Sequence, residues 1–367
     1  MSALLRRFLS PAGVQRLRNV RRSLRSRLLR LAASSRLLSN ITYLLREDFG
    51  REHQAVLKGK LAYQASLEQI GASCALLRRN VHRLEKGLIM RPRRSVFAEV
   101  FIEETVDCYA HAMRIGALAA DEKKWATDVL SEYFSVVGAS PVTERARRVF
   151  EAARLGAETP LRESDGAGPD LRRGQAFKPY PYEAIAKTDI SFASLEALFL
   201  QRRSVRWYED RIVPKVLVQQ AADIASLAPS ACNRQPYRFA FCGDKEKAVA
   251  IAKCAGGTGG FAENLPALVV LLGDLSAFPY ERDRHLIYID GSLAVMQFML
   301  ALETLGLSSC PINWPEDDLS ERAVRQILPL KDHERIVMLL AVGYADRTGG
   351  IPFSQKKVRQ QILEDIS

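Results

Sequence analysis

The second half of the chain alternates between short apolar runs of strand length and longer segments with a helical pattern. The runs PALVVLLGD (266–274) and RIVMLLAVGYA (335–345) are apolar nearly throughout, which is typical of strands buried on both faces. YRFAFCGD (237–244) predicts a third strand closed by a turn. Helices are predicted around these strands, at residues 194–203, 213–228, 244–255, 284–307 and 320–328. This order restricts the second half to a sheet layered with helices.

The first half carries a different pattern. From about residue 57 to residue 155 the spacing of apolar residues is helical nearly throughout. Residues 156–189 are rich in Pro and Gly and have no periodicity, which indicates a linker or a surface-wrapping loop. With 367 residues, 47% of them apolar, the chain can bury a substantial core. We therefore expect four parts: a basic arm (1–46), a helical region (47–155), a linker or wrapping loop (156–190) and a C-terminal domain (191–367).

The net charge of +11 is confined to the N-terminal arm. Residues 1–46 hold eleven Arg, no Lys and no acidic residue, and the remaining 42 Lys and Arg balance the 42 Asp and Glu. Apolar residues recur every three or four positions in the arm, which predicts an amphipathic basic helix. These residues are Val14, Leu17, Val20, Leu24, Leu28 and Leu31.

Such a helix is compatible with several roles. It could lie on an anionic membrane surface, dock on a partner or on the protein itself, act as an Arg-rich targeting segment, or bind nucleic-acid phosphates. The neutral remainder of the chain argues against a nucleic-acid partner. The arm lacks the apolar block of a secretory signal, and we expect no run that approaches the roughly 18 apolar residues of a membrane span. The expected location is cytoplasmic, and a peripheral position at the inner membrane face is one of the roles that stay open for the arm.

The cysteines and histidines predict no metal site. The six cysteines form no CxxC pair, and only five histidines are present, so we expect reduced thiols in a reducing compartment. GGTGGFA (256–262) contains G-x-G-x-x-A, but a predicted helix precedes it, which argues against a dinucleotide fingerprint and favours a loop near a ligand. Cys232 is a weak nucleophile candidate and His285 a capping or surface residue. We expect no catalytic acid, base or nucleophile.

A second basic cluster lies inside the helical region, in NVHRLEKGLIMRPRR (80–94). Gly87 ends the helical pattern there, and charged or titratable residues surround it: His82, Arg83, Glu85, Lys86, Arg91, Arg93 and Arg94. The cluster fits a solvated helix end whose cations complement the helix dipole. It also fits a site for an anionic or phosphate-bearing ligand, and the sequence leaves both readings open.

A phosphate site is predicted in RRSVRWYED (202–210). Arg202, Ser204 and Arg206 alternate, so an extended backbone would present all three on one face. Two guanidiniums and a hydroxyl suit a phosphate group, which takes bidentate contacts from Arg. IPFSQKK (351–357), far along the chain, offers a second hydroxyl and ammonium pair.

Between these two segments, LAPSACNRQP (227–236) breaks a predicted helix. Pro229 stops the helix and restricts the residue before it to an extended shape. Ser230, Asn233 and Gln235 then offer amide and hydroxyl groups to a ligand that has both donors and acceptors.

These motifs carry a resemblance to a known family. Residues from about 191 to 367 resemble the nitroreductase family of FMN-dependent oxidoreductases. RRSVRWYED resembles the family's RRS-x-R phosphate motif, and LAPSACNRQP resembles its APS-x-x-N-x-QPW stretch. ALETLGLSSC resembles its A-x-x-x-GLGSC segment, and IPFSQKK its closing basic motif. HRLEKGL also resembles a segment of long nitroreductase-like proteins with helical N-terminal extensions.

The resemblance implies an α+β fold with a central, mainly antiparallel sheet, preceded here by an all-α region. It implies a homodimer with FMN at the interface. The implied FMN-binding residues are Arg202, Arg203, Ser204, Arg206, Pro229, Ser230, Asn233, Gln235, Cys310, Pro311, Ile312, Lys356 and Lys357.

The resemblance also implies a role for each group. The three alternating residues of RRSVR and the two lysines would bind the ribityl phosphate, and Pro229 and Ser230 would reach the flavin held mainly by the other subunit. Asn233 would bond the isoalloxazine edge, and the segment 310–313 would line the ring. Two departures from the family are Tyr237 in place of Trp and Lys in place of Arg in the closing motif.

The implied activity is a ping-pong transfer of hydride from NAD(P)H, through the flavin, to a small-molecule acceptor. Two alternatives remain open on the sequence. One is an FMN-dependent oxidase or dehydrogenase for a specialised substrate, such as an anionic or glycan-linked one. The other is a flavin-binding, membrane-docked protein with little turnover.

Overall fold

The computed structural model describes residues 11–46, 48–156 and 176–366. Residues 157–175 of the predicted linker and the first ten residues of the predicted arm therefore lie outside the described residues. The chain divides into two compact units, Met1–Gln54 and Ala55–Ser367.

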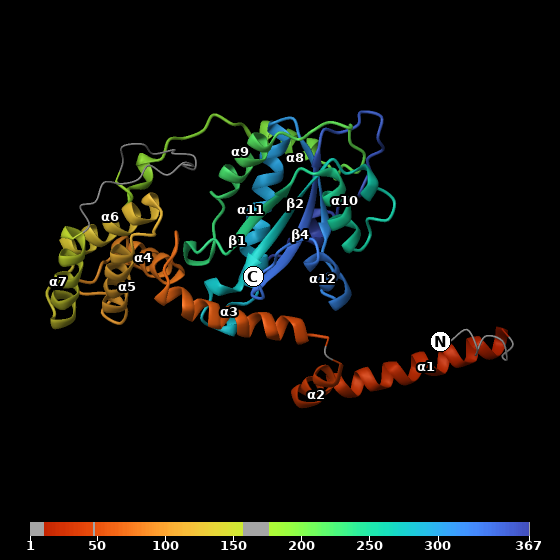
Figure 1. Ribbon diagram of the computed structural model, residues 1–367, viewed down its shortest axis with the longest axis horizontal. Helices are drawn as coiled ribbons and strands as arrows, with labels where there is room; N and C mark the ends of the chain where they lie inside the picture. The colour runs from red at the N-terminus through yellow and green to blue at the C-terminus, as the bar shows by residue number, and fades with distance from the viewer. Residues whose placement is uncertain (1–10, 47, 157–175, 367) are drawn as a thin grey trace. The chain divides into compact units, whose positions relative to one another are not determined.

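The first unit is helical in its described part. It contains α1 (Pro11–Ala33), α2 (Arg36–Arg46) and the start of α3 (Gly50–Glu68) (Figure 1). The described part of the arm is thus helical, as its periodicity predicts, and consists of two helices. Val20, Leu24, Leu28 and Leu31 of its apolar stripe are each 54–65% exposed.

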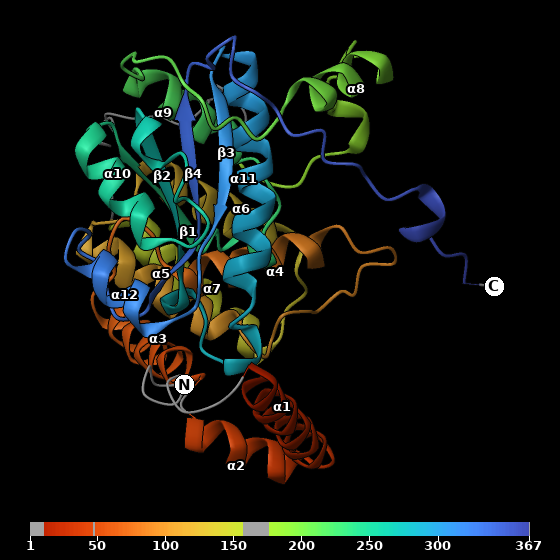
Figure 2. The ribbon, with the colours of Figure 1, turned by 90° about the vertical axis from the view of Figure 1, so that its right-hand side faces the viewer.

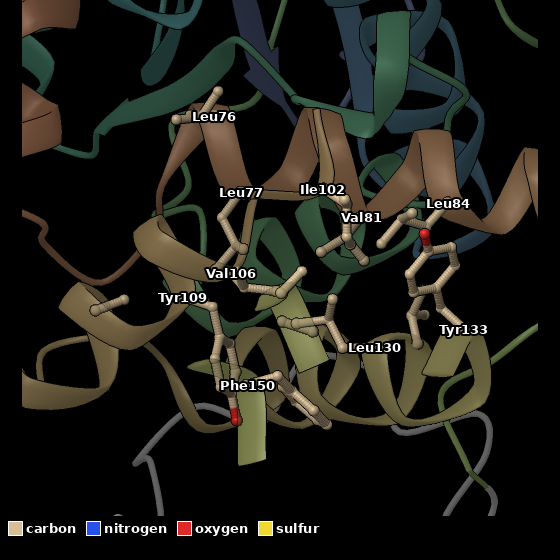
Figure 3. Packing of buried hydrophobic residues seen from close by; sticks show 14 of the residues in the cluster. Leu76, Leu77, Val81, Leu84, Ile102, Val106, Tyr109, Leu130, Tyr133 and Phe150 are labelled. Carbon is tan, nitrogen blue, oxygen red and sulfur yellow. The ribbon is translucent and has the colours of Figure 1, made fainter. Parts of the chain in front are cut away.

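Four helices of the second unit form a separate apolar core. They are α4 (Ala75–Leu88), α5 (Ile102–Ile115), α6 (Ala120–Val136) and α7 (Pro141–Leu155). Each helix turns an apolar stripe inward, and the buried side chains meet between them, as Figure 3 shows for Leu77, Val106, Tyr109, Leu130 and Phe150. Within residues 11–46 and 48–156 the structure contains helices and no strand, which confirms the predicted all-α N-terminal region.

The sheet domain follows. It contains four strands, β1 (Tyr237–Cys242), β2 (Ala267–Asp274), β3 (Ser308–Asn313) and β4 (Glu334–Gly343). Their order is β1-β2-β4-β3, and all three pairings are antiparallel. The helices of this domain are α8 (Phe192–Gln201), α9 (Lys215–Ala225), α10 (Lys245–Cys254), α11 (Leu286–Thr304) and α12 (Asp318–Arg325). Short 3-10 turns are η2 (Tyr182–Ala184), η3 (Ala231–Asn233), η4 (Ala262–Asn264), η5 (Leu275–Ala277), η6 (Glu281–Asp283) and η7 (Arg359–Gln361).

Helices cover both faces of the sheet, which explains the continuous apolar runs. In β2, Leu268 and Val270 belong to a core shared with α10 and α12, whereas Val269 and Leu271 belong to a core shared with α9 and α11. Successive side chains of a strand point to opposite faces, so both sets must be apolar. The α+β class with an antiparallel sheet is confirmed.

Two expectations need correction. The predicted order of elements omits β3, because SSCPIN has two Ser and a Pro and so lacks a strand's composition. It is a strand because it pairs with β4 along its length, and Pro is tolerated in an outer strand. The second concerns residues Glu281–Thr304, whose mean hydropathy of 1.4 and length would suffice to cross a membrane. Half of the 18-residue window with this hydropathy is buried inside the protein, as in the core helix of a globular domain.

The second unit also contains a close contact between α3 and the sheet domain. A Cβ at Gly59 would lie 2.7 Å from Cβ of Leu275, so only glycine allows the helix this near to η5. Ala55, one turn earlier, is fully buried in the same apolar cluster as Leu275 and Phe278. The helical region and the sheet domain therefore share packed surface.

Candidate functional site

The segment that follows α8 is extended, as the alternation of Arg202, Ser204 and Arg206 requires. Ser204 forms a parallel bridge to Ser309 at the start of β3, and the Val205 amide donates a 3.1 Å hydrogen bond to the Ser309 carbonyl. The phenol of Tyr208 donates to the Val205 carbonyl at 2.7 Å. These contacts fix the segment along the outer side of β3.

Two polar atoms along this edge are buried and have no hydrogen-bond partner among the described residues: Nε of Arg202 and Oγ of Ser309. An unsatisfied buried polar group costs roughly 1–3 kcal/mol, so native structures rarely leave one without a partner. The Arg206 guanidinium, in contrast, lies 5.6 Å from the Phe261 ring and donates a 3.4 Å bond to the Ser204 carbonyl. The edge thus combines two guanidiniums with two hydroxyls.

Cys310 lies within electrostatic reach of the same groups. Burial raises the pKa of its thiol above the ordinary value, and Arg206, the Ser204 hydroxyl and Arg202 oppose that shift. Cys310 and Ile312 are buried in the core of the sheet domain, whereas Pro311 between them is exposed. A ligand beside β3 would therefore meet Pro311 and the backbone rather than the two buried side chains.

The turn after α9 holds three non-glycine residues in the left-handed region. Their φ angles are 55° at Cys232, 51° at Asn233 and 49° at Gln235. Such conformations cost free energy and persist where surrounding contacts impose them, often at ligand sites. The Ser230 hydroxyl accepts a 3.1 Å hydrogen bond from the backbone amide of Gln235. The side-chain amide of Gln235 donates a 2.7 Å hydrogen bond to the Ser226 carbonyl.

Arg78 of α4 binds this turn from the helical region. Its Nε donates to the Asn233 carbonyl at 2.8 Å, and its Nη2 donates to Oε1 of Gln235 at 3.0 Å. Its Nη1 pairs with Glu122 of α6 at 2.8 Å, and Glu122 is nearly buried. The side-chain amide of Gln235 is thus hydrogen-bonded within the protein, whereas the Asn233 side chain has no hydrogen bond within the described residues.

Asp290 of α11 holds the turn from the other side. Its Oδ2 accepts a 3.0 Å hydrogen bond from the Ala231 amide, and the residue is 3% exposed. Burial raises the pKa of this carboxyl, and the Ala231 amide and Arg234 oppose the shift. The turn is therefore fixed by α4 and α11 together.

The structure does not join the closing motif to the Arg cluster. Lys356 and Lys357 are exposed, in a segment from residue 350 to residue 366 that is exposed throughout (Figure 2). Within residues 176–366, no hydrogen bond or ion pair links either lysine to Arg202, Ser204 or Arg206. Among the described residues, the Arg203 side chain donates only to the Arg202 carbonyl, at 3.1 Å.

The structure thus gathers Arg202, Ser204 and Arg206 at one edge, with Cys310 and Pro311 beside them. Pro229, Ser230, Asn233 and Gln235 form the turn before β1, which is at the opposite edge of the sheet from β3. Sequence reasoning missed Arg78, Glu122, Asp290 and Ser309. The only available signal was Asp290, the single acid in the apolar run LIYIDGSLAV, since nothing in the spacing of α4 distinguishes Arg78.

The match to a known family falls in the sheet domain. Residues 199–258 and 247–344 match the model of the Nitroreductase family. The chain is 29% identical to a Thermus thermophilus protein named NADH dehydrogenase, over 181 residues that cover 41% of this chain and 86% of that protein. It is 24% identical to human iodotyrosine deiodinase 1 over 218 residues, or 51% of this chain and 72% of that protein.

Among solved structures, an FMN-dependent nitroreductase from Clostridium difficile R20291 matches 47% of this chain and 99% of its own, with 25% identity and a TM-score of 0.40. RRSVRWYED, LAPSACNRQP and ALETLGLSSC fall within the matched residues, whereas IPFSQKK (351–357) lies beyond them. Residues 199–344 thus match the Nitroreductase family, and in this protein they are joined to a helical region that the match does not cover.

Proposed function

We propose that the chain is an FMN-dependent oxidoreductase that passes hydride from NAD(P)H to a small-molecule acceptor. The family of residues 199–344 supports this proposal, as do relatives that are named NADH dehydrogenase. The observation that carries it is the edge of β3, where Arg202, Ser204 and Arg206 lie along one extended segment beside Ser309.

The groups along that edge fit a phosphate ester. Nε of Arg202 and Oγ of Ser309 are buried donors that need acceptor oxygens, and a phosphate supplies three. Arg202, Ser204 and Arg206 would hold the ribityl phosphate of FMN. Pro311 and the backbone of β3 would line the ring. When bound, FMN supplies the hydride chemistry, and the protein supplies its position and its electrostatic surroundings.

The turn at residues 229–236 lies at the other edge of the sheet, so in the proposed homodimer it would form a wall of the flavin site together with the β3 edge of the other copy. Arg78 and Asp290 hold its backbone, which leaves the Asn233 amide to bond the polar edge of a flavin ring. The cationic side chains around the edge would stabilise negative charge on a reduced ring. In this mechanism no side chain needs to act as a general acid or base.

A second copy of the chain is part of the proposal. α8 has no buried residue, although its sequence FASLEALFLQ is mainly apolar, and Phe192 is 80% exposed. Phe353, Ile362 and Leu363 of the exposed C-terminal segment are 62–86% exposed. Apolar surface on this scale commonly marks an interface. In a homodimer, the partner would cover these side chains, and Lys356 and Lys357 could reach the phosphate of the other copy.

For the arm, we propose a peripheral position on the anionic inner surface of the cytoplasmic membrane. The described leucines of α1 are exposed, and Arg16, Arg22, Arg25 and Arg27 accompany them on the same helix. Apolar contact and cationic attraction act together in such helices.

The cofactor test uses the full chain, purified without added flavin and then saturated with FMN. We expect about one FMN per chain after gel filtration, released on heating and identified by chromatography. A chain that takes up no flavin, while circular dichroism shows it folded, would refute the proposed function.

A further inference from the structure

A cavity lies beside the turn that follows α4, in the helical region and outside the family match. Its volume is about 480 Å³, within the range of small-molecule sites. It is lined by Arg83, Gly87, Met90, Arg91, Pro92, Arg94, Phe97, Ala98 and Phe101. This is the basic segment NVHRLEKGLIMRPRR, for which the sequence left two readings open.

The apolar side of the cavity is firmly supported. Phe97 packs edge-on against Tyr133, with 5.0 Å between ring centroids, and the Tyr133 hydroxyl donates a 2.8 Å bond to the Phe97 carbonyl. A Cβ at Gly87 would come within 2.6 Å of the Phe97 ring, so glycine lets this ring lie against α4. Tyr133 is itself a fully buried core residue, labelled in Figure 3.

On the cationic side, Arg83 is positioned but not neutralised, and Arg91 and Arg94 are exposed. The Arg83 guanidinium stacks 3.6 Å above the Phe101 ring and donates a 3.2 Å bond to Oδ1 of the buried Asn80. Burial lowers the pKa of Arg83, and Arg79 lowers it further. In the ranges that the structure describes, no ion pair involves Arg83, Arg91 or Arg94. A solvated helix end would not require three unpaired guanidiniums around an aromatic cavity.

We propose that this cavity is a second ligand site, which binds a small molecule with a carboxylate or phosphate group and an aromatic or acyl body. Arg91 and Arg94 bind the anionic group, and Arg83 completes the cationic side. The body of the ligand lies against Phe97, Phe101 and Met90. The site does not depend on flavin binding, since none of its residues belongs to the sheet domain.

The test is isothermal titration calorimetry of the full chain with 1-naphthyl phosphate. Arg91→Gln combined with Arg94→Gln should weaken binding at least about tenfold, because both charge-assisted contacts are lost. Both side chains are exposed, so the variant should fold, which a thermal melt checks. Arg93→Gln is the matched control: it removes an exposed arginine of the same turn that does not line the cavity, and it should leave affinity unchanged.

Three further measurements show where the ligand binds. 1-Naphthol, which lacks the charge, and inorganic phosphate, which lacks the apolar body, should each bind at least about tenfold more weakly. Arg202→Gln combined with Arg206→Gln should leave the affinity for 1-naphthyl phosphate unchanged. The proposal is overturned if the wild type does not bind the probe, if inorganic phosphate binds equally well, or if the Arg202 and Arg206 variant, rather than the Arg91 and Arg94 variant, loses binding.

Discussion

Nε of Arg78 donates a 2.8 Å hydrogen bond to the carbonyl oxygen of Asn233, across 155 positions of sequence. The bond joins the helical region to the turn that we propose as a wall of the flavin site. The same guanidinium reaches Gln235 and Glu122, so one side chain ties the turn to α4 and α6. The region outside the family match thereby shapes the backbone of the matched domain.

The first prediction concerns Arg78. Arg78→Lys keeps a cation opposite Glu122 but cannot make the two bonds to the turn, so FMN affinity should fall by up to about thirtyfold, at roughly 1 kcal/mol per bond. Fluorescence titration with FMN measures this change. Lys86→Gln alters an exposed cation at the end of the same helix and should have no effect. Wild-type affinity in the Arg78→Lys variant would show that the turn does not need this contact.

The proposed phosphate site at Arg202, Ser204 and Arg206 is tested by comparing the binding of two flavins, FMN and riboflavin. Arg202→Gln or Arg206→Gln should each weaken FMN about tenfold or more, since a hydrogen bond to a charged group contributes about 1.5–3 kcal/mol. Neither should change affinity for riboflavin, which has no phosphate. Lys215→Gln, an exposed cation at the start of α9, serves as the control. Equal losses for both flavins would place the two arginines at the ring instead.

Asn233 has two separable properties, a left-handed backbone and a free side-chain amide. Asn233→Gly removes the amide and relieves the φ of 51°, so FMN retention should fall while the melting temperature is kept. Asn233→Ala should lose FMN as well and also lose about 1 kcal/mol of stability, because alanine resists this conformation. Full flavin occupancy in the glycine variant would mean that the amide does not contact the ring.

Asp290 makes stability depend on pH. Its carboxyl has a raised pKa in the folded protein, so folding favours the protonated form, and this contribution is lost as pH rises from the ordinary Asp value through the raised one. Asp290→Asn cannot ionise and can still accept the Ala231 bond. Thermal melts across the acidic range should therefore show that the melting temperature of the variant rises relative to that of the wild type as pH increases. A difference that is constant with pH would contradict the account.

The arm is tested with vesicles. Deleting residues 1–46 should abolish sedimentation of the protein with vesicles that contain anionic lipid, at about 1 kcal/mol per basic residue near the surface. Leu24→Ser combined with Leu28→Ser keeps every charge and should weaken binding by removing apolar contact. Neutral vesicles provide the baseline. Equal binding by the deletion and the full chain would refute a membrane role.

The strands that are buried on both faces were predictable from sequence. Residues 267–272 and 336–342 must be apolar at every position because helices cover both sides of the sheet, and a continuous run is easy to recognise. β3 was not predictable, since SSCPIN becomes a strand only through pairing with β4. Local composition carries no information about that partner.

In the candidate site, too, local sequence predicts some features, and others depend on residues that are distant in the chain. The alternation of Arg202, Ser204 and Arg206 predicts an extended segment, because it is a local property of the backbone. Arg78 and Ser309 could not be predicted, since each acts through a residue far away in the chain. The cavity at Arg83 needed Phe97 and Phe101, which lie beyond the basic segment that drew attention to it.

The most direct test of the central claim is an anaerobic titration of the FMN-loaded chain with NADH and, separately, NADPH, followed by flavin absorbance. We predict that at least one nucleotide bleaches the flavin completely at about one equivalent, and that the colour returns when an oxidised acceptor is added. A bound flavin that neither nucleotide reduces would contradict an NAD(P)H-driven oxidoreductase.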